Sequence, residues 1–425
     1  MGNLMLAELT APSGLWVIIL NWIQSGVSNF AWTIILFTLL IKVCLSPLDF
    51  FIKWSTKKST LIQQKCAPQV AKLQKKYANN NQALQVQTQA LYKKEGYNIG
   101  ASCVVMLVNL VVTLLVFLSI FTSLKEVSAY QAIKQYQALD NAYTTTYTQI
   151  YGDEFTKKVN ELFAEDGLGT YDPTFNYEEN PEENAIAIEN INLAKTYATE
   201  TATASNVVKE AVKNTWKQEK ESWAWITNIW VTDGKANPLP TYNGLKNLAT
   251  SAKGLFGSKV NNEYVEVVNS INENHYNTVT QIIHNQSNGW NGYYILAILA
   301  GVVTFLSTYI AELGNKLKRK KENKQDEQEI KVKKNQFIKT PETEKSSNPT
   351  QQMGGTMKFM KILMPIMMII FVLSSSAAFG IYVVTQSLIS IGLGALINLI
   401  VNKITYKKQL EVLQYLDKIE GKKKK

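Results

Sequence analysis

The sequence predicts an all-α membrane protein with five transmembrane helices, a cytosolic helical hairpin and a mainly helical external insert. Its apolar residues gather in runs of about 20, the length that an α-helix needs to cross roughly 30 Å of hydrocarbon. Lysine-rich connecting segments alternate with one long acidic segment, as segments on opposite sides of a membrane do. Between the first two runs, apolar residues recur at helical spacing, which predicts the hairpin.

Six apolar stretches give the membrane part of this prediction. The first, Gly14 to Gln24, carries two tryptophans and is predicted to lie at the membrane interface. Five longer runs are predicted to cross the bilayer, and the last two are separated only by Ser374, Ser375 and Ser376, which suits a tight turn. The predicted organisation is an interfacial N-terminal helix (1–27), transmembrane helix 1 (28–52), a cytosolic helical hairpin (53–100), transmembrane helix 2 (101–124), an external domain (125–290), transmembrane helix 3 (291–312), a basic cytosolic loop (313–356), transmembrane helices 4 and 5 (357–402, about Phe359 to Leu373 and Ala377 to Val401) and a basic cytosolic tail (403–425).

Charge orients these segments. Residues 53–99 carry nine lysines and one glutamate, residues 313–358 carry twelve basic and six acidic groups, and the tail from 403 carries eight lysines and three acids. Residues 125–290 instead carry thirteen lysines and 21 acids. Because basic segments stay in the cytoplasm, the N-terminus is predicted outside and the C-terminus inside a bacterial plasma membrane.

The connecting segments differ in predicted structure. Residues 53–98 are expected to form two amphipathic helices that separate at Asn79-Asn80-Asn81, with Pro68 kinking the first. In the external domain, helical patterns lie around 126–139, 184–215 and 259–285, with turn-rich pieces such as Gly234 to Gly244 between them. Two lysine-rich stretches, 313–352 and Gly421 to Lys425, are predicted to be disordered.

Lys42 is the main candidate for function, because it lies well inside the first span. An ammonium at the centre of a bilayer costs about 2.5–3.5 kcal/mol on the insertion scale. One interpretation is that its long side chain reaches the cytosolic face, helped by Asp49. The other is that Lys42 faces a water-filled cavity together with Thr38 and Ser46, which lie four residues before and after it.

Enzyme signatures are absent from the sequence. There is no Walker loop, HExxH or GxSxG motif, so we expect no nucleotide hydrolysis, no cofactor and no metal. The three cysteines show no pairing or metal-binding pattern, and the two histidines lie outside the predicted spans. A glutamate cluster could bind calcium, but a solvated surface explains it better: Glu178, Glu179, Glu182 and Glu183. The N-terminus lacks the pattern of a cleavable signal peptide.

At residues 57–103, KKSTLIQQKCAPQVAKLQKKYANNNQALQVQTQALYKKEGYNIGASC, the chain resembles the cytosolic hairpin of the YidC/Oxa/Alb insertases. The shared features are a lysine- and glutamine-rich helix with a proline, the LQKKY turn, a second helix ending in LYKKEG, and a cysteine near the start of the next span. Four other stretches resemble core spans of the family: TIILFTLLIKVCLSPL, YYILAILAGVVTFLS, QMGGTMKFMKILMPIMMIIF and IYVVTQSL. The resemblance covers roughly 14–124 and 291–403.

The resemblance implies an insertase that receives nascent membrane proteins in a positively charged hydrophilic groove and releases them laterally into the bilayer. It implies groove residues Lys42, Thr38, Ser46, Asn109, Ser307, Thr308 and Gln386, and a substrate slide at Tyr382 and Val383. Other expected partners are the ribosome, a Sec-type translocon and anionic lipids, but not DNA. The ribosome or lipid would contact basic residues of the tail: Lys403, Lys407, Lys408, Lys422, Lys423, Lys424 and Lys425.

The chain also departs from the family pattern. Lys42 stands where the family usually has arginine, which keeps the charge but loses the planar fork that binds a carboxylate through two bonds. Asn109 stands where glutamine is common, and Ala297 replaces a proline. Val383 stands where an aromatic residue is common. The large external domain lies between the second and third spans, so its role cannot be transferred from the family.

Two other classes of function remain open at this stage. A transporter or channel would normally need paired or acidic intramembrane groups, and Lys42 has no obvious buried acidic partner. A membrane-anchored binding protein would act through 125–290, so deletion of this domain should abolish its function and spare that of an insertase.

Overall fold

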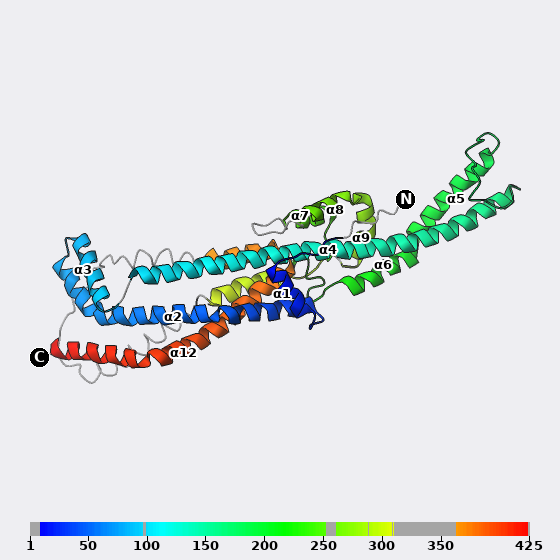
Figure 1. Cartoon of the computed structure of the whole chain (residues 1–425). Helices are drawn as coiled ribbons and strands as arrows, with labels where there is room; N and C mark the ends of the chain where they lie inside the picture. Colours follow the sequence, from blue (N-terminus) through cyan, green and yellow to red (C-terminus); the bar gives the residue numbers. More distant parts are fainter. Residues whose placement is uncertain are drawn as a thin grey trace, which may run out of the picture.

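The described part of the computed structural model consists of helices joined by turns and loops, with one isolated bridge between Trp223 and Ile226 (Figure 1). It describes residues 9–96, 99–251, 261–287, 289–307 and 363–423, together with Tyr309. The helices are α1 (Leu15–Gln24), α2 (Phe30–Lys76), α3 (Asn81–Lys94), α4 (Ile99–Glu165), α5 (Ala185–Ala204), α6 (Asn206–Glu219), α7 (Tyr242–Ser251), α8 (Asn261–Ser270), α9 (Glu273–Ser287), α12 (Ala377–Lys423), and two shorter apolar helices, Ile295–Ser307 and Leu363–Leu373.

Three of these helices, α2, α4 and α12, are long and apolar enough to cross a membrane. They contain predicted spans 1, 2 and 5 and are longer than these spans. Helix α2 continues from span 1 into the hairpin, and α4 continues through the boundary at 124 into the insert. Helix α12 continues through the tail to Lys423, so residues 421–423 are helical instead of disordered.

The reason for these long helices is the lack of a breaker at the predicted boundaries. No glycine or proline follows Leu124 until Gly152, and none follows Val401 until Gly421. Extending an existing helix by one residue is much easier than nucleating a new one, so each helix continues past the end of the predicted span. Pro47 and Pro68 lie inside α2 without ending it.

The third and fourth predicted spans coincide with the helices Ile295–Ser307 and Leu363–Leu373, which are shorter than a typical span. A turn at Ser374, Ser375 and Ser376 joins the second of these helices to α12. The expected ends of span 3 and the start of span 4, as well as the basic loop 313–356, lie outside the described residues.

The helix bundle has one main core, which joins α1, α2, α4, α12, the two shorter helices and part of the insert. Helix α1 turns Val17, Leu20 and Ile23 into this core, and the indole Nε1 of Trp16 donates to Ser119 Oγ at 2.8 Å. The apolar face of α1 is therefore covered by helices, while Trp22 stays 70% exposed. We call the end of the bundle next to the insert the outer end and the end next to α3 the inner end (Figure 1).

At the inner end, α3 packs against the last turns of α2. Asn80 caps α3 by accepting from the Ala83 amide at 2.9 Å, which explains why the chain turns at the run of asparagines. Lys65 Nζ pairs with Glu95 Oε2 at 2.6 Å. The end of α12 joins them, because Gln69 Nε2 donates to the hydroxyl of Tyr415 at 3.3 Å.

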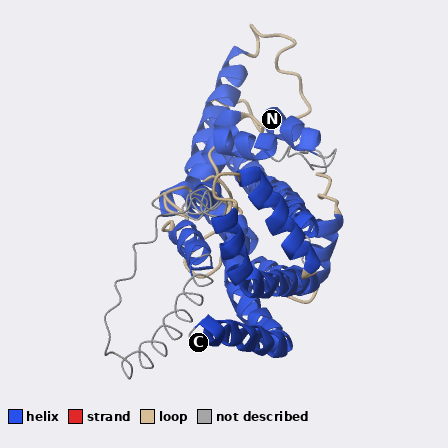
Figure 2. Ribbon diagram, turned by 90° about the vertical axis from the view of Figure 1, so that its left-hand side faces the viewer, coloured by secondary structure: helices blue, strands red, loops and turns tan. Residues whose placement is uncertain are grey.

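The insert contains two further cores. Like the rest of the described chain, it is built of helices and loops (Figure 2). One core lies between α4, α6, α7, α8 and α9 and includes the buried rings of Tyr136, Tyr264 and Tyr276. The other lies between the end of α4 and α5, around Val159 and Phe163, and forms a projecting arm. The helical patterns expected around 126–139, 184–215 and 259–285 fall in α4, α5 with α6, and α8 with α9. Helix α7 and the extension of α4 to Glu165 were not predicted.

We predict that the insert loses stability in mild acid through His284. Burial lowers the pKa of this imidazole below its usual 6.5, and its Nε2 lies 3.1 Å from the Leu239 carbonyl oxygen. The unfolded chain gains a proton near pH 6.5 while the folded chain keeps the ring neutral, so stability should fall as the pH drops below 6.5. His284→Gln keeps a donor but does not titrate. In thermal unfolding of the detergent-solubilised protein, the drop in Tm from about pH 8 to about pH 5.5 should be smaller by a few degrees in the variant; an equal drop would contradict the prediction.

Candidate substrate groove

Lys42 lies on α2, where its side chain is half-buried beside the buried Ile41 and the exposed Val43. In the described part of the chain, its amine forms no ion pair or hydrogen bond. The carboxylate of Asp49, two helical turns along, acts on it only through space. A charge that is neither paired nor fully exposed favours a polar neighbour such as water or an arriving carboxylate.

Thr38 and Ser46, predicted to share the face of Lys42, are satisfied within α2 itself. The Thr38 hydroxyl is buried and donates to the Ile34 carbonyl at 2.6 Å. The Ser46 hydroxyl donates to the Val43 carbonyl at 2.8 Å. Such bonds to the preceding turn are how hydroxyls are accommodated in apolar helices. The hydroxyl oxygens can still accept a hydrogen bond, so the two residues add polarity near Lys42.

The inner half of α4 is packed much less than the rest of the bundle. Asn109 is half-buried there. Large apolar side chains on successive turns around it are exposed, so no other described helix covers this part of α4: Val104, Leu107, Val108, Leu110, Val111, Leu114 and Leu115. In a bilayer, such side chains face lipid or an open space between helices.

Helix α12 brings a second polar group into the bundle. Gln386 is half-buried, and its Oε1 atom is buried without a hydrogen-bond donor in the described structure. An unsatisfied buried acceptor costs about 1–3 kcal/mol, which makes Gln386 a place where a donor would bind. Its neighbour Ser387 lies 3.4 Å from the Thr304 hydroxyl, and Ser307 donates to the Thr304 carbonyl at 2.8 Å. Thr308 lies outside the described residues.

The predicted substrate slide does not lie on the surface. Tyr382 and Val383 are each only 3% exposed and belong to the main core. The ring of Tyr382 packs against Phe117 and Phe379. This face of α12 is directed inward because it packs against α4, so its position does not support a slide at these two residues.

Lys53 is a site residue that the sequence did not single out. Its Nζ donates to the Gly394 carbonyl at 2.9 Å and so connects α2 to α12. A Cβ atom at residue 394 would lie 3.2 Å from this amine, so a glycine helps the close approach. In the sequence Lys53 was only one of nine lysines in a basic segment. Its position four residues after Asp49, on the same helical face, was the available signal.

The predicted contact residues of the tail are partly described. Lys403, Lys407 and Lys408 are exposed on α12. The backbone of Lys422 and Lys423 belongs to the last turn of α12, while their side chains and the whole of Lys424 and Lys425 lie outside the described residues.

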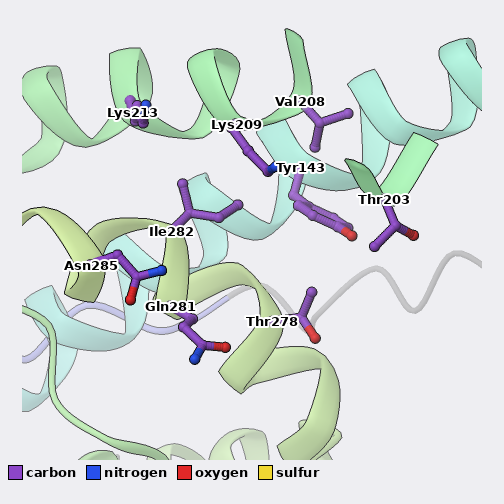
Figure 3. A pocket seen from close by; sticks show the side chains of 9 residues that line it. All are labelled: Tyr143, Thr203, Val208, Lys209, Lys213, Thr278, Gln281, Ile282 and Asn285. Atoms are coloured by element: carbon purple, nitrogen blue, oxygen red, sulfur yellow. The ribbon is translucent and has the colours of Figure 1, made fainter. Parts of the chain in front are cut away.

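A separate cavity of about 380 Å³ lies in the insert (Figure 3). Lys209 and Lys213 line it, but Lys209 donates to the Ala204 carbonyl at 3.1 Å and Lys213 pairs with Glu210 at 2.9 Å. None of the residues predicted for the groove lines this cavity. The described residues contain no group of three metal-ligating side chains.

In comparisons with known proteins, the family match lies in the first half of the chain. Residues 22–202 match the protein-family model described as "60Kd inner membrane protein". The chain is 36% identical over 110 residues to the membrane protein insertase YidC of Vesicomyosocius okutanii, and 34% identical over 99 residues to that of Fusobacterium nucleatum. These alignments cover 25% and 23% of this chain but only 18% and 46% of the two relatives, so the chain matches less than half of their length. No solved structure matches this one.

We predict that Lys53→Met separates α2 from α12 at the inner end. A hydrogen bond from a charged donor is worth about 1.5–3 kcal/mol, so the Tm of the purified protein should fall by several degrees. Lys53→Arg retains a charged donor and should lose less. Lys72→Met, at an exposed lysine of the same helix, is the matched control and should leave the Tm unchanged. Equal Tm values for Lys53→Met and Lys72→Met would show that the bond does not hold the helices together.

Proposed function

Because the chain belongs to the YidC/Oxa/Alb family of membrane proteins, we propose that it inserts hydrophobic nascent proteins into the bilayer. With three long apolar helices, it is a multi-pass membrane protein. In the proposed mechanism, a substrate enters a positively charged hydrophilic groove from the cytosol and leaves laterally into lipid. No nucleotide is hydrolysed, and no covalent bond is made or broken.

The observation that carries the proposal is the half-buried ammonium of Lys42, which has no ion pair or hydrogen bond among the described residues and lies in a helix that is apolar on either side of it. A short acidic segment of the substrate would be attracted to this charge while it crosses the apolar layer. Asn109 and Gln386 would add polar contacts, and the buried oxygen of Gln386 would accept from a substrate backbone amide. The groove would thus replace part of the water that the crossing segment loses.

The energetics of insertion allow this mechanism to work without fuel. Twenty apolar residues at about −0.3 to −0.6 kcal/mol each stabilise the inserted helix by roughly 6–12 kcal/mol. An inside-negative potential adds about 2.3 kcal/mol per 100 mV for each carboxylate that moves outward. The protein therefore needs only to lower the barrier for the polar segment.

The slide is the apolar surface along which a substrate helix would leave the groove. Exposed apolar residues near α12 suit this role better than the buried Tyr382 and Val383. Ile298, Val302 and Phe305 are 45–58% exposed and lie on one face of the helix Ile295–Ser307, and Leu388 of α12 is 53% exposed. A substrate helix leaving the groove would pack along these side chains towards lipid.

The proposed partners follow from charge and position. In the orientation predicted from charge, α3 and the end of α12 face the cytosol, where the first helices of a nascent chain arrive. The exposed lysines of α12 would contact ribosomal RNA or anionic lipid through their charge. A Sec-type translocon is a further partner that the family resemblance suggests.

We predict that the charge of Lys42 determines insertion. Lys42→Arg should insert a small single-span protein with an acidic N-terminal tail at nearly the normal rate. Lys42→Ala and Lys42→Glu should insert it at least about tenfold more slowly, corresponding to a barrier raised by 1.4 kcal/mol or more. The measurement is protease protection of the substrate in proteoliposomes at matched protein levels. Lys72→Glu, which changes charge outside the groove, is the control. Normal insertion by Lys42→Glu would sink the charge mechanism, and solute flux without insertion would identify a transporter.

We predict that insertion does not require the projecting arm. The ammonium of Lys158 lies 5.7 Å from the ring of Tyr197, so the two chain segments are adjacent there. Replacing residues 159–196 with a short Gly/Ser linker removes the arm core but leaves the other cores intact. An insertase should keep most of its activity in the protease-protection assay, whereas a binding protein that acts through the arm should lose its binding. Deletion of the whole insert, the test suggested by the sequence, is unsuitable because part of the insert belongs to the bundle core.

A further inference from the structure

The cavity of about 380 Å³ in the insert lies between α6 and α9, and α4 contributes to its lining (Figure 3). Ligand sites in proteins usually measure about 300–1,000 Å³, so this cavity is near the lower end of that range. It has room for a short peptide segment or a small organic molecule, but not for a folded partner. The chemistry of its lining decides which of these it suits.

The lining of the cavity carries positive charge. Its two charged residues are Lys209 and Lys213, both half-buried on α6, and no described carboxylate lines it. Residues 125–290 as a whole hold 21 acids against thirteen lysines, so the cavity differs from the composition of its own domain. A charged ligand of this cavity is therefore an anion.

Both ammoniums can bind such an anion. Lys209 Nζ donates to the Ala204 carbonyl at 3.1 Å, which uses only one of its three N–H groups. Lys213 Nζ pairs with Glu210 at 2.9 Å, but the Glu210 side chain is 57% exposed, and an exposed pair of this kind contributes little to stability. A ligand carboxylate can therefore take the place of Glu210 at little cost.

The opposite wall offers groups that suit a peptide backbone. Gln281 and Asn285 lie one turn apart on α9, and their side-chain amides form no hydrogen bond in the described part of the chain. Each amide has both donors and an acceptor, which are the groups that a peptide N–H and C=O need. A simple anion such as phosphate makes no use of the acceptor. This wall therefore favours a peptide over an inorganic anion.

The spacing of the two lysines defines the form of the peptide. Residues four apart on a helix are displaced by about 6 Å along its axis. In an extended peptide, side chains on the same face are two residues and about 6.6 Å apart. Acidic residues at alternate positions of an extended peptide thus match Lys209 and Lys213.

The apolar part of the lining is held in place by neighbouring residues. Val208 and Ile282 line the cavity together with the ring of Tyr143. This ring packs edge-to-face with His275, with centroids 5.6 Å apart, and His275 Nε2 in turn contacts Asp140 Oδ1. A surface that is ordered beforehand loses little freedom when a ligand binds. Apolar side chains between the acidic ones would pack on it.

We propose that the insert binds an extended acidic peptide segment in this cavity, with alternate carboxylates on Lys209 and Lys213 and peptide groups on Gln281 and Asn285. The peptide site does not depend on the insertase function, because binding can be measured without insertion. Two sources could supply the segment: the acidic tail that an inserted substrate sends outward, or a separate peptide outside the membrane. Only the first source rests on the proposed function.

Binding of a synthetic peptide tests the site. The probe is a short peptide of alternating glutamate and valine with an uncharged fluorophore, added to the full-length protein in nanodiscs of zwitterionic lipid. Fluorescence anisotropy should show saturable binding. Lys209→Gln keeps a donor for the Ala204 carbonyl but removes the charge, so the Kd should rise at least about tenfold while the Tm stays the same. Lys246→Gln, at an exposed lysine of α7 that does not line the cavity, is the matched control and should not change the Kd.

A charge swap separates ligand binding from a role in folding. The double variant Lys209→Glu/Lys213→Glu should no longer bind the glutamate peptide. It should bind a peptide of alternating lysine and valine at least about tenfold more tightly than the unaltered protein does, because the attraction is reversed. Equal binding of the glutamate peptide by the unaltered protein and the double variant would overturn the proposal, as would the lack of saturable binding to the unaltered protein.

Two further measurements test the peptide assignment. Gln281→Leu should weaken binding of the glutamate peptide, and this variant together with Lys209→Gln decides the question if the double variant does not fold. Inorganic phosphate should compete only at concentrations at least about tenfold above the peptide, since it leaves the amides of α9 unused. Competition by phosphate at the same concentration as the peptide would overturn the assignment to a peptide.

Photo-crosslinking distinguishes the two sources of the segment. A benzophenone amino acid replaces Thr278, an exposed residue at the cavity, in proteoliposomes that receive the single-span substrate. A crosslink to the acidic tail would support the site with the substrate as its source. Saturable peptide binding without a crosslink would support the site with a separate peptide as its ligand. Normal peptide binding without any insertion would reject the insertase function alone, so the two failures are distinguishable.

Discussion

The bundle depends on the pairing of backbone amides at the start of its membrane helices. In hydrocarbon no water can satisfy these groups, so the protein must supply a partner for each one that is buried. Two carbonyls and one carboxylate of residues 219–234 meet this need for α12 and for the helix Ile295–Ser307. A segment that the sequence places in an external domain is therefore part of the main core of the bundle, since Ile226, Ile229 and Trp230 are buried with residues of α1, α2 and α12.

Deeper in the bundle, some polar groups have hydrogen-bond partners among the described residues and others do not. The hydroxyls of Thr38 and Ser46 are satisfied by their own helix, and Lys53 is held by the Gly394 carbonyl. The ammonium of Lys42 and the carbonyl oxygen of Gln386 have no such bonds in the described structure. Structural polar groups in proteins are usually paired, so Lys42 and Gln386 are candidates for contact with a substrate or with water.

The long helices connect these features mechanically. Helix α4 runs without interruption from the unpacked inner half, past residues 219–234 and into the arm of the insert. Helix α12 runs from its contact with residues 229–231 to the inner end, where it meets α2. These two helices are therefore shared by the inner and outer ends of the bundle and, for α4, by the arm of the insert.

The sequence by itself determined the all-α class, the apolar segments that become α2, α4 and α12, and the turns at the run of asparagines and at the three serines. These are local properties, set by hydrophobic length, helical periodicity and capping residues. It also identified Lys42, because a charge in an apolar run is conspicuous without any knowledge of the fold.

Only the tertiary structure decided which faces of the helices are buried and which distant residues meet. Tyr382 and Val383 were expected to face a substrate, but the packing of α12 on α4 turns them into the core. Asp233, Asn228 and Asn291 look in the sequence like ordinary loop residues, because their hydrogen-bond partners lie about 60 positions away or more, or on other helices.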